Sequence, residues 1–163
     1  MLRDHKHPYG YPKSQARERG LTHAHFEQLR EDNLLADRVA HACQLITDVG
    51  GGYGVEQPFP WKGSIGMFEL ASYKRLRGAH QSVVFDQCRH GQCTTKPTEI
   101  LFHRAEFDKL EATCNHSNGH PPIKGRSSDG EFRTKKLAAY PAQLNQAIAD
   151  IIADAISSGR CSH

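Results

Sequence analysis

The chain has 163 residues, of which 37% are hydrophobic, which is enough for one globular domain with a single core. No run of 18 apolar residues predicts a membrane span, and the first 20 residues lack the apolar segment of a secretory signal. The net charge of +3 permits nucleic-acid binding without indicating it, and five cysteines, an odd number, favour a reducing intracellular compartment, either nucleus or cytoplasm.

Residues 1–22 are polar and basic, with two prolines before the first apolar run, and we expect an irregular arm there. Two interpretations are open, contact with a phosphate backbone and a plain solvated tail. Residues 23–163 are expected to form the globular domain. Within it, apolar residues recur every three or four positions over 25–49 and predict a helix, which the glycines at 50–52 would end.

Six further elements are predicted after that helix. In chain order they are a strand over 53–56, a helix over 66–76, strands over 82–85 and 99–102, and helices over 105–113 and 141–157. The consecutive apolar residues Val83, Val84 and Phe85 predict a strand with both faces covered. Helices alternating with short strands are typical of an α/β fold with a largely parallel sheet.

The apolar positions of these elements are expected to share one core. Its predicted members are Phe26, Leu29, Val39, Ile46, Val83, Val84, Phe85, Leu144, Ile148 and Ile152.

Cysteines and histidines gather between residues 88 and 120, where two loops carry metal-ligand chemistry. Cys114, His116 and His120 form a C-x-H-x3-H cluster, and Cys88 can supply a fourth ligand, with Cys93 as its reserve. Two thiolates and two imidazoles are the ligands that zinc prefers in tetrahedral structural sites. The spacing matches no standard zinc finger, so unliganded loop residues are the alternative.

One carboxylate and one basic loop are further candidates for ligand contact. Glu56 is expected at the carboxyl end of a strand, where α/β proteins bind ligands, or as a cap of a neighbouring helix. A basic loop can follow a phosphate backbone or be simply solvated. Its members are Lys124, Arg126, Arg133, Lys135 and Lys136.

Three stretches taken together resemble the second half of a cytosine-5 DNA methyltransferase domain. They are Val55-Glu56-Gln57-Pro58, then His90-Gly91 with the run from Lys96 to Leu101, and Ala139-Tyr140-Pro141-Ala142 with the helix after it. The order and approximate spacing agree over residues 24–157, with Gln57 in the place of the family's asparagine.

The chain is most similar to a divergent branch of that family found in retroelement polyproteins of protists. The residues that carry this likeness are Glu56-Gln57-Pro58 with Trp61, Asp86-Gln87-Cys88, His90-Gly91, Lys96-Pro97-Thr98, the Cys/His stretch 114–120, and Tyr140-Pro141. The resemblance implies a partial Rossmann-like sheet with flanking helices. It also implies contact with nucleic acid through Glu56, Lys96 and the basic loop.

The family's catalytic parts have no counterpart in this sequence. Ser14-Gln15-Ala16-Arg17 resembles the stretch that follows the family's nucleophile, but upstream Pro8 is followed by Tyr9 instead of cysteine. Methyl transfer to cytosine needs that thiolate, and the glycine-rich cofactor loop is also missing. We therefore expect a catalytically incomplete domain that does not bind S-adenosylmethionine alone. A subunit of a larger assembly, or half of a split enzyme completed by a second chain, are the alternatives.

Overall fold

The computed structural model describes residues 3–60, 64–121, 125–126, 130–132 and 139–160. Its elements in chain order are α1 (Lys13–Glu18), α2 (His23–Asp48), β1 (Tyr53–Pro58), η1 (Met67–Glu69), α3 (Ala71–Ala79), β2 (Gln81–Asp86), η2 (Gln87–His90), β3 (Pro97–His103), η3 (Phe107–Leu110) and α5 (Ala142–Ser157). In this described part of the chain, no helix combines the length and the apolar composition that a membrane crossing needs.

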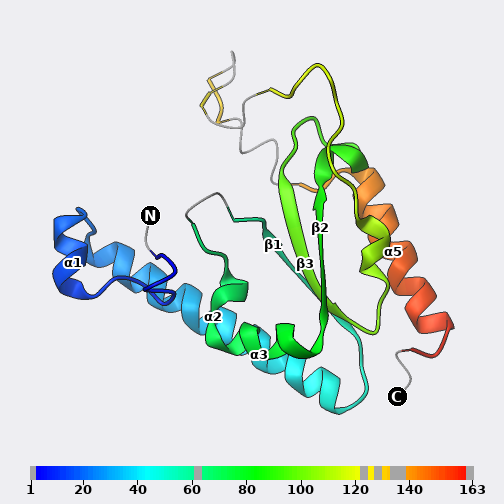
Figure 1. Cartoon of the computed structure of the whole chain (residues 1–163), viewed down its shortest axis with the longest axis horizontal. Helices are drawn as coiled ribbons and strands as arrows, with labels where there is room; N and C mark the ends of the chain where they lie inside the picture. Colours follow the sequence, from blue (N-terminus) through cyan, green and yellow to red (C-terminus); the bar gives the residue numbers. More distant parts are fainter. Residues whose placement is uncertain (1–2, 61–63, 122–124, 127–129, 133–138, 161–163) are drawn as a thin grey trace.

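The fold is mixed α/β, with a small sheet between two groups of helices (Figure 1). The three strands lie in the order β1-β3-β2, and β3 runs antiparallel to both neighbours. The prediction of a largely parallel sheet is therefore wrong, and the prediction of a Rossmann-like sheet is not confirmed. The connection from β2 to β3 contains only the short η2 turn. A connection this short favours antiparallel strands, because a parallel pair needs a longer crossover.

The two outer strands, β1 and β2, are parallel to each other. Both β1 and β2 are antiparallel to β3, so they run in the same direction, and α3 lies between them along the chain. This is a β-α-β unit that is split by the insertion of β3. The alternation of helix and strand in the sequence was thus a real signal, but it did not show that a third strand enters between the other two.

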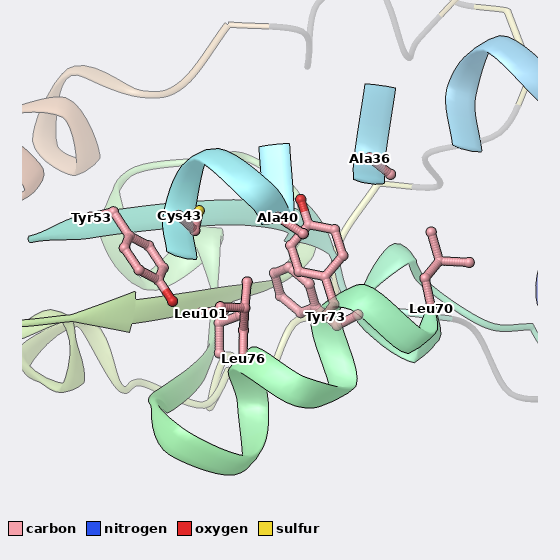
Figure 2. Packing of buried hydrophobic residues seen from close by; sticks show 9 residues of the cluster. Ala36, Ala40, Cys43, Tyr53, Leu70, Tyr73, Leu76 and Leu101 are labelled. Atoms are coloured by element: carbon pink, nitrogen blue, oxygen red, sulfur yellow. The ribbon is translucent and has the colours of Figure 1, made fainter. Parts of the chain in front are cut away.

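The interior forms two hydrophobic clusters on opposite faces of the sheet, in place of the single core that was predicted. On one face, Ala40 and Cys43 of α2 meet Tyr73 and Leu76 of α3 above Leu101 of β3 (Figure 2). On the other face, α5 and η3 cover the sheet (Figure 1). That second cluster consists of Val83, Phe85, Ile100, Phe102, Phe107, Leu110, Leu144 and Ile151.

Three residues expected in the core are substantially exposed. Val84 is 41% exposed, Ile152 46% and Ile46 36%. Val84 points away from the face that buries Val83 and Phe85, because side chains alternate along a strand. The strand with both faces covered is β3, which is central in the sheet and whose residues from Thr98 to Phe102 are all buried.

The remaining differences from the expected elements are local. The segment expected to be an irregular arm contains the α1 helix, and Tyr9 ties it to the domain. The Tyr9 carbonyl accepts from Asn33 Nδ2 at 2.8 Å, and its hydroxyl accepts from the backbone N–H of Ala71 at 3.1 Å. The single helix expected over 66–76 is divided at Leu70, whose extended backbone separates η1 from α3. The helix expected over 105–113 is the short η3 turn.

Candidate metal centre

The candidate site joins the end of β2 to the loop that follows η3. Cys88 lies in η2, immediately after β2, and it is buried. Asp86 holds the loop against this strand end, because its backbone N–H donates to the Ala112 carbonyl at 2.8 Å. Its carboxylate accepts from the backbone N–H of Cys114 at 2.7 Å. These two hydrogen bonds place Cys114 beside Cys88, although 25 residues lie between them in the sequence.

Four side chains converge at this junction. The sulfurs of Cys88 and Cys114 and a ring nitrogen each of His116 and His120 all lie within 4.8 Å of one another. The Cys114 sulfur is 3.4 Å from His116 Nδ1 and 3.1 Å from His120 Nε2. The structure therefore brings together the four residues that the sequence predicted as ligands.

A further hydrogen bond orients His120 toward the cluster. Its Nδ1 lies 3.1 Å from the carbonyl oxygen of Cys93. An N–H at Nδ1 that donates to this carbonyl leaves the Nε2 lone pair facing Cys114, and metal-binding histidines are commonly held in this way. The Cys93 side chain is exposed, and its sulfur is not part of the four-atom group. Cys93 thus contributes to the site through its backbone.

The local electrostatics favour the ionised thiolate at Cys114. The backbone N–H of His116 lowers the pKa of Cys114 most, followed by the His116 and His120 rings, to about 6. The Cys114 side chain in turn raises the pKa of His120. Burial, together with the neighbouring Cys114, raises the pKa of Cys88 to about 11. Cys114 therefore ionises more readily than Cys88, and the two histidines stabilise its thiolate.

This arrangement fits a tetrahedral metal ion. Zn–S bonds of about 2.3 Å and Zn–N bonds of about 2.0 Å place tetrahedral ligand atoms about 3.3–3.8 Å apart. The separations from the Cys114 sulfur to the two ring nitrogens, 3.4 and 3.1 Å, are close to that range, and no pair of the four ligand atoms is more than 4.8 Å apart. The four residues can therefore hold a metal ion.

The residues predicted to contact nucleic acid are only partly described. Lys124, Arg133, Lys135 and Lys136 lie outside the described residues. Arg126 stacks on the Phe132 ring, with its guanidinium carbon 4.1 Å from the ring centroid. Its loop pairs with Phe132 in an isolated β-bridge.

Glu56 and Lys96 meet at the side chain of Tyr140. Glu56 is hydrogen-bonded to the Tyr140 side chain, and Lys96 Nζ lies 5.2 Å from the centroid of the same ring. Burial and the Glu56 carboxylate together raise the pKa of Tyr140 well above its ordinary value. These three residues come from the end of β1, the segment before β3 and the segment before α5.

Sequence reasoning missed two parts of the metal centre, Asp86 and the Cys93 carbonyl. Asp86 had a usable signal, since a carboxylate at a strand end can accept a backbone hydrogen bond from a nearby loop. The Cys93 carbonyl had none, because any residue offers the same backbone oxygen. Comparisons of the chain with protein-family models, curated proteins and solved structures find no match.

Proposed function

We propose that this chain is a zinc-binding domain in which one structural Zn²⁺ ties the loop after η3 to the end of β2. The observation that carries the proposal is the convergence of four ligand atoms within 4.8 Å. Two thiolates and two imidazoles favour zinc over the hard ions Mg²⁺ and Ca²⁺, which take oxygen ligands. Four protein ligands complete a tetrahedral shell, so this chemistry supports a structural role and not a catalytic one.

The loop needs such a link because it buries little apolar surface. Residues 111–121 contain no helix or strand, and polar contacts hold them to the preceding segments. These are the hydrogen bonds from Asp86, from Arg89 to Asn115, and between His120 and the Cys93 carbonyl. A metal bound to residues of both segments would stabilise the junction through four bonds at once. Structural zinc contributes directly to folding free energy, because the unfolded chain does not present a formed site.

Metal analysis of the full chain, purified without added metal, tests the proposal. We expect about one equivalent of zinc in the wild type and a loss of most of it in Cys114→Ser, since serine is a poor zinc ligand. Cys93→Ser is the matched control, because it removes a neighbouring thiol whose sulfur is outside the ligand group. It should keep its zinc.

Thermal unfolding with and without a chelator gives a second measurement. The chelator should lower the melting temperature of the wild type and of Cys93→Ser, and leave Cys114→Ser unchanged. A folded wild type without zinc, unresponsive to added Zn²⁺, would refute the proposal.

The meeting of Glu56, Lys96 and Tyr140 favours a second candidate function, contact with nucleic acid. If the chain is a methyltransferase-like domain derived from a partial Rossmann-like fold, as its sequence resemblance implies, Glu56 and Lys96 belong to the surface that contacts nucleic acid. A carboxylate, an ammonium group and an aromatic ring at one place offer hydrogen bonds, charge and stacking.

Fluorescence anisotropy with a short labelled DNA duplex and a single strand tests this candidate. Lys96→Glu should weaken binding and reduce its salt dependence, whereas Lys74→Glu on α3, whose ammonium pairs with Glu69 at 3.2 Å, is a control of equal charge change. Equal effects of the two variants would show that net charge alone determines binding. The chain is expected to transfer no labelled methyl group to either DNA.

A further inference from the structure

We propose that Cys88 and Cys114 form a redox-sensitive pair, in which a peroxide converts the two zinc-binding thiolates into a disulfide and thereby releases the metal. This inference rests on the proposed zinc site and concerns its regulation. It is carried by the position of the two sulfurs and by the difference in their exposure.

The two sulfurs are close enough to react with each other. They belong to the group whose ligand atoms lie within 4.8 Å, and the two cysteines interact directly through their side chains. The Cys114 backbone N–H donates to Asp86, which ends β2 two residues before Cys88. This hydrogen bond keeps Cys114 next to the end of the strand. The two sulfurs are therefore neighbours in the folded chain, as a disulfide between them requires.

Exposure distinguishes the roles of the two cysteines. Cys88 is 8% exposed, whereas Cys114 is partly exposed. An open depression on the same loop is lined in part by the other two candidate ligands, His116 and His120. Because Cys114 is itself partly exposed, a small peroxide can reach it, whereas the buried Cys88 is protected. We infer that Cys114 is oxidised first and that Cys88 then resolves the product.

The chemistry balances in two steps. The Cys114 thiolate attacks one oxygen of hydrogen peroxide, the O–O bond breaks, and a sulfenic acid forms while the leaving hydroxide takes a proton to become water. The Cys88 thiolate then attacks the sulfenic sulfur, the S–O bond breaks, and the second hydroxide also leaves as water. Two thiolates, one peroxide and two protons give one disulfide and two waters. The peroxide is reduced, the sulfurs are oxidised, and Zn²⁺ keeps its charge.

Oxidation should release zinc without unfolding the chain. The disulfide removes two of the four ligands, and His116 with His120 alone would bind the ion weakly. The new covalent bond joins the same two segments that the metal joined, the end of β2 and the loop after η3. The link between them is thus retained, while the surface beside His116 and His120 changes.

The other described cysteines should not take part. Cys43 is buried between α2, α3 and the sheet, in the cluster on one face. Cys93 is exposed beside the site, but its sulfur is not part of the ligand group. Instead, the sulfur donates to Oε1 of its neighbour Gln92 at 3.5 Å. Among the four cysteines that the structure describes, it therefore predicts one specific pairing, Cys88 with Cys114.

The experiment treats the reduced full chain with hydrogen peroxide and follows zinc release with a colorimetric chelator, while peptide mapping identifies the disulfide. We expect one equivalent of zinc to be released as the count of free thiols falls from five to three, with Cys88 joined to Cys114. The far-ultraviolet circular dichroism should be retained. Cys93→Ser should release zinc at the wild-type rate, within about two-fold.

Cys114→His keeps a metal ligand at this position but cannot form the disulfide, so it should retain its zinc under the same peroxide. A disulfide from Cys114 to Cys93, oxidation without a disulfide, or equal zinc release from Cys114→His would overturn the inference. The zinc content of the reduced protein is measured first and tests the proposed function separately. If that protein held no zinc, disulfide mapping of the metal-free chain would still decide the pairing.

Discussion

At the scale of single residues, Gly54 shows how closely the layers of this fold approach each other. Gly54 lies on β1, and a Cβ atom added there would be 2.8 Å from the ring of the buried Phe107. Such a contact is too short for any real side chain, so the ring or the strand would have to shift. The glycine therefore allows η3 to pack against β1.

We expect Gly54→Ala to lower the free energy of unfolding by about 1–3 kcal/mol, the usual cost of overpacking. Gly78→Ala in α3 is the matched control, since nothing lies within 4 Å of its added Cβ. It should stabilise the helix by about 0.5–1 kcal/mol. Urea unfolding measures both, and a Gly54→Ala variant as stable as the wild type would contradict the packing argument.

A buried carboxylate gives the second prediction at this scale. Glu99 is 2% exposed and accepts from Arg77 Nη2 at 2.8 Å and from Gln57 Nε2 at 3.0 Å. Arg77→Gln would leave the charge on Glu99 without its cation. Breaking a fully buried pair costs about 3–5 kcal/mol, and we expect about 2 kcal/mol here because water reaches Arg77, whose side chain is 41% exposed.

The double variant Arg77→Gln with Glu99→Gln is the control for this prediction. It removes both charges, so it should lose less stability in urea than Arg77→Gln alone. If the double variant were the less stable of the two, the destabilisation would come from lost packing and not from the unpaired charge.

At the scale of elements, α5 shows that an apolar stripe predicts a helix better than it predicts which residues are buried. Ile151 is 4% exposed and packs in the cluster under the sheet, whereas Ile156 on the same helix is 65% exposed. The two differ in burial because the sheet and η3 cover only part of the stripe.

We expect Ile151→Ala to cost about 2–5 kcal/mol, as for other buried large-to-small changes. Ile156→Ala should change the free energy of unfolding by no more than about 0.5 kcal/mol. Both substitutions remove the same atoms from one helix, so the main difference between them is the burial of the side chain. Similar losses in chemical denaturation would mean that α5 does not pack as described.

At the scale of the whole molecule, two histidines from separate elements meet beside β1. His80 follows α3 and His103 ends β3, and their ring centroids are 4.4 Å apart, next to the Tyr53 ring. Burial lowers the pKa of both histidines, and for His103 the neighbouring His80 and Arg104 lower it further. His80 Nδ1 is buried and has no hydrogen-bond partner among the residues that the structure describes.

Because both pKa values lie below those of the unfolded chain, the unfolded state takes up protons first as the pH falls. The stability that these groups contribute is complete above about pH 6.5 and is lost as the pH falls toward their lowered values. We therefore expect the urea midpoint to fall on acidification from about pH 7.5 to about pH 5.5.

His103→Gln should reduce that fall, and His23→Gln should not, since the His23 side chain at the start of α2 is 89% exposed. Circular dichroism at fixed urea concentration across this range measures the difference. If all three proteins lost stability in parallel, the histidine pair would not be the cause.

The sequence alone located nearly every element of the domain, because hydrophobic periodicity is a property of neighbouring residues. It also identified Cys88, Cys114, His116 and His120 from their chemistry, and the structure brings these four together. It did not show Asp86 holding the loop, since that contact joins residues 28 positions apart.

Only the tertiary structure decided the order and direction of the strands. The apolar run at Val83–Phe85 was interpreted as the strand with both faces covered, yet the insertion of β3 between β1 and β2 makes β3 the central strand. There are two hydrophobic clusters in place of one core, because α2 and α3 cover one face of the sheet and η3 and α5 cover the other. Which strands pair depends on contacts between distant segments, and local periodicity contains no information about them.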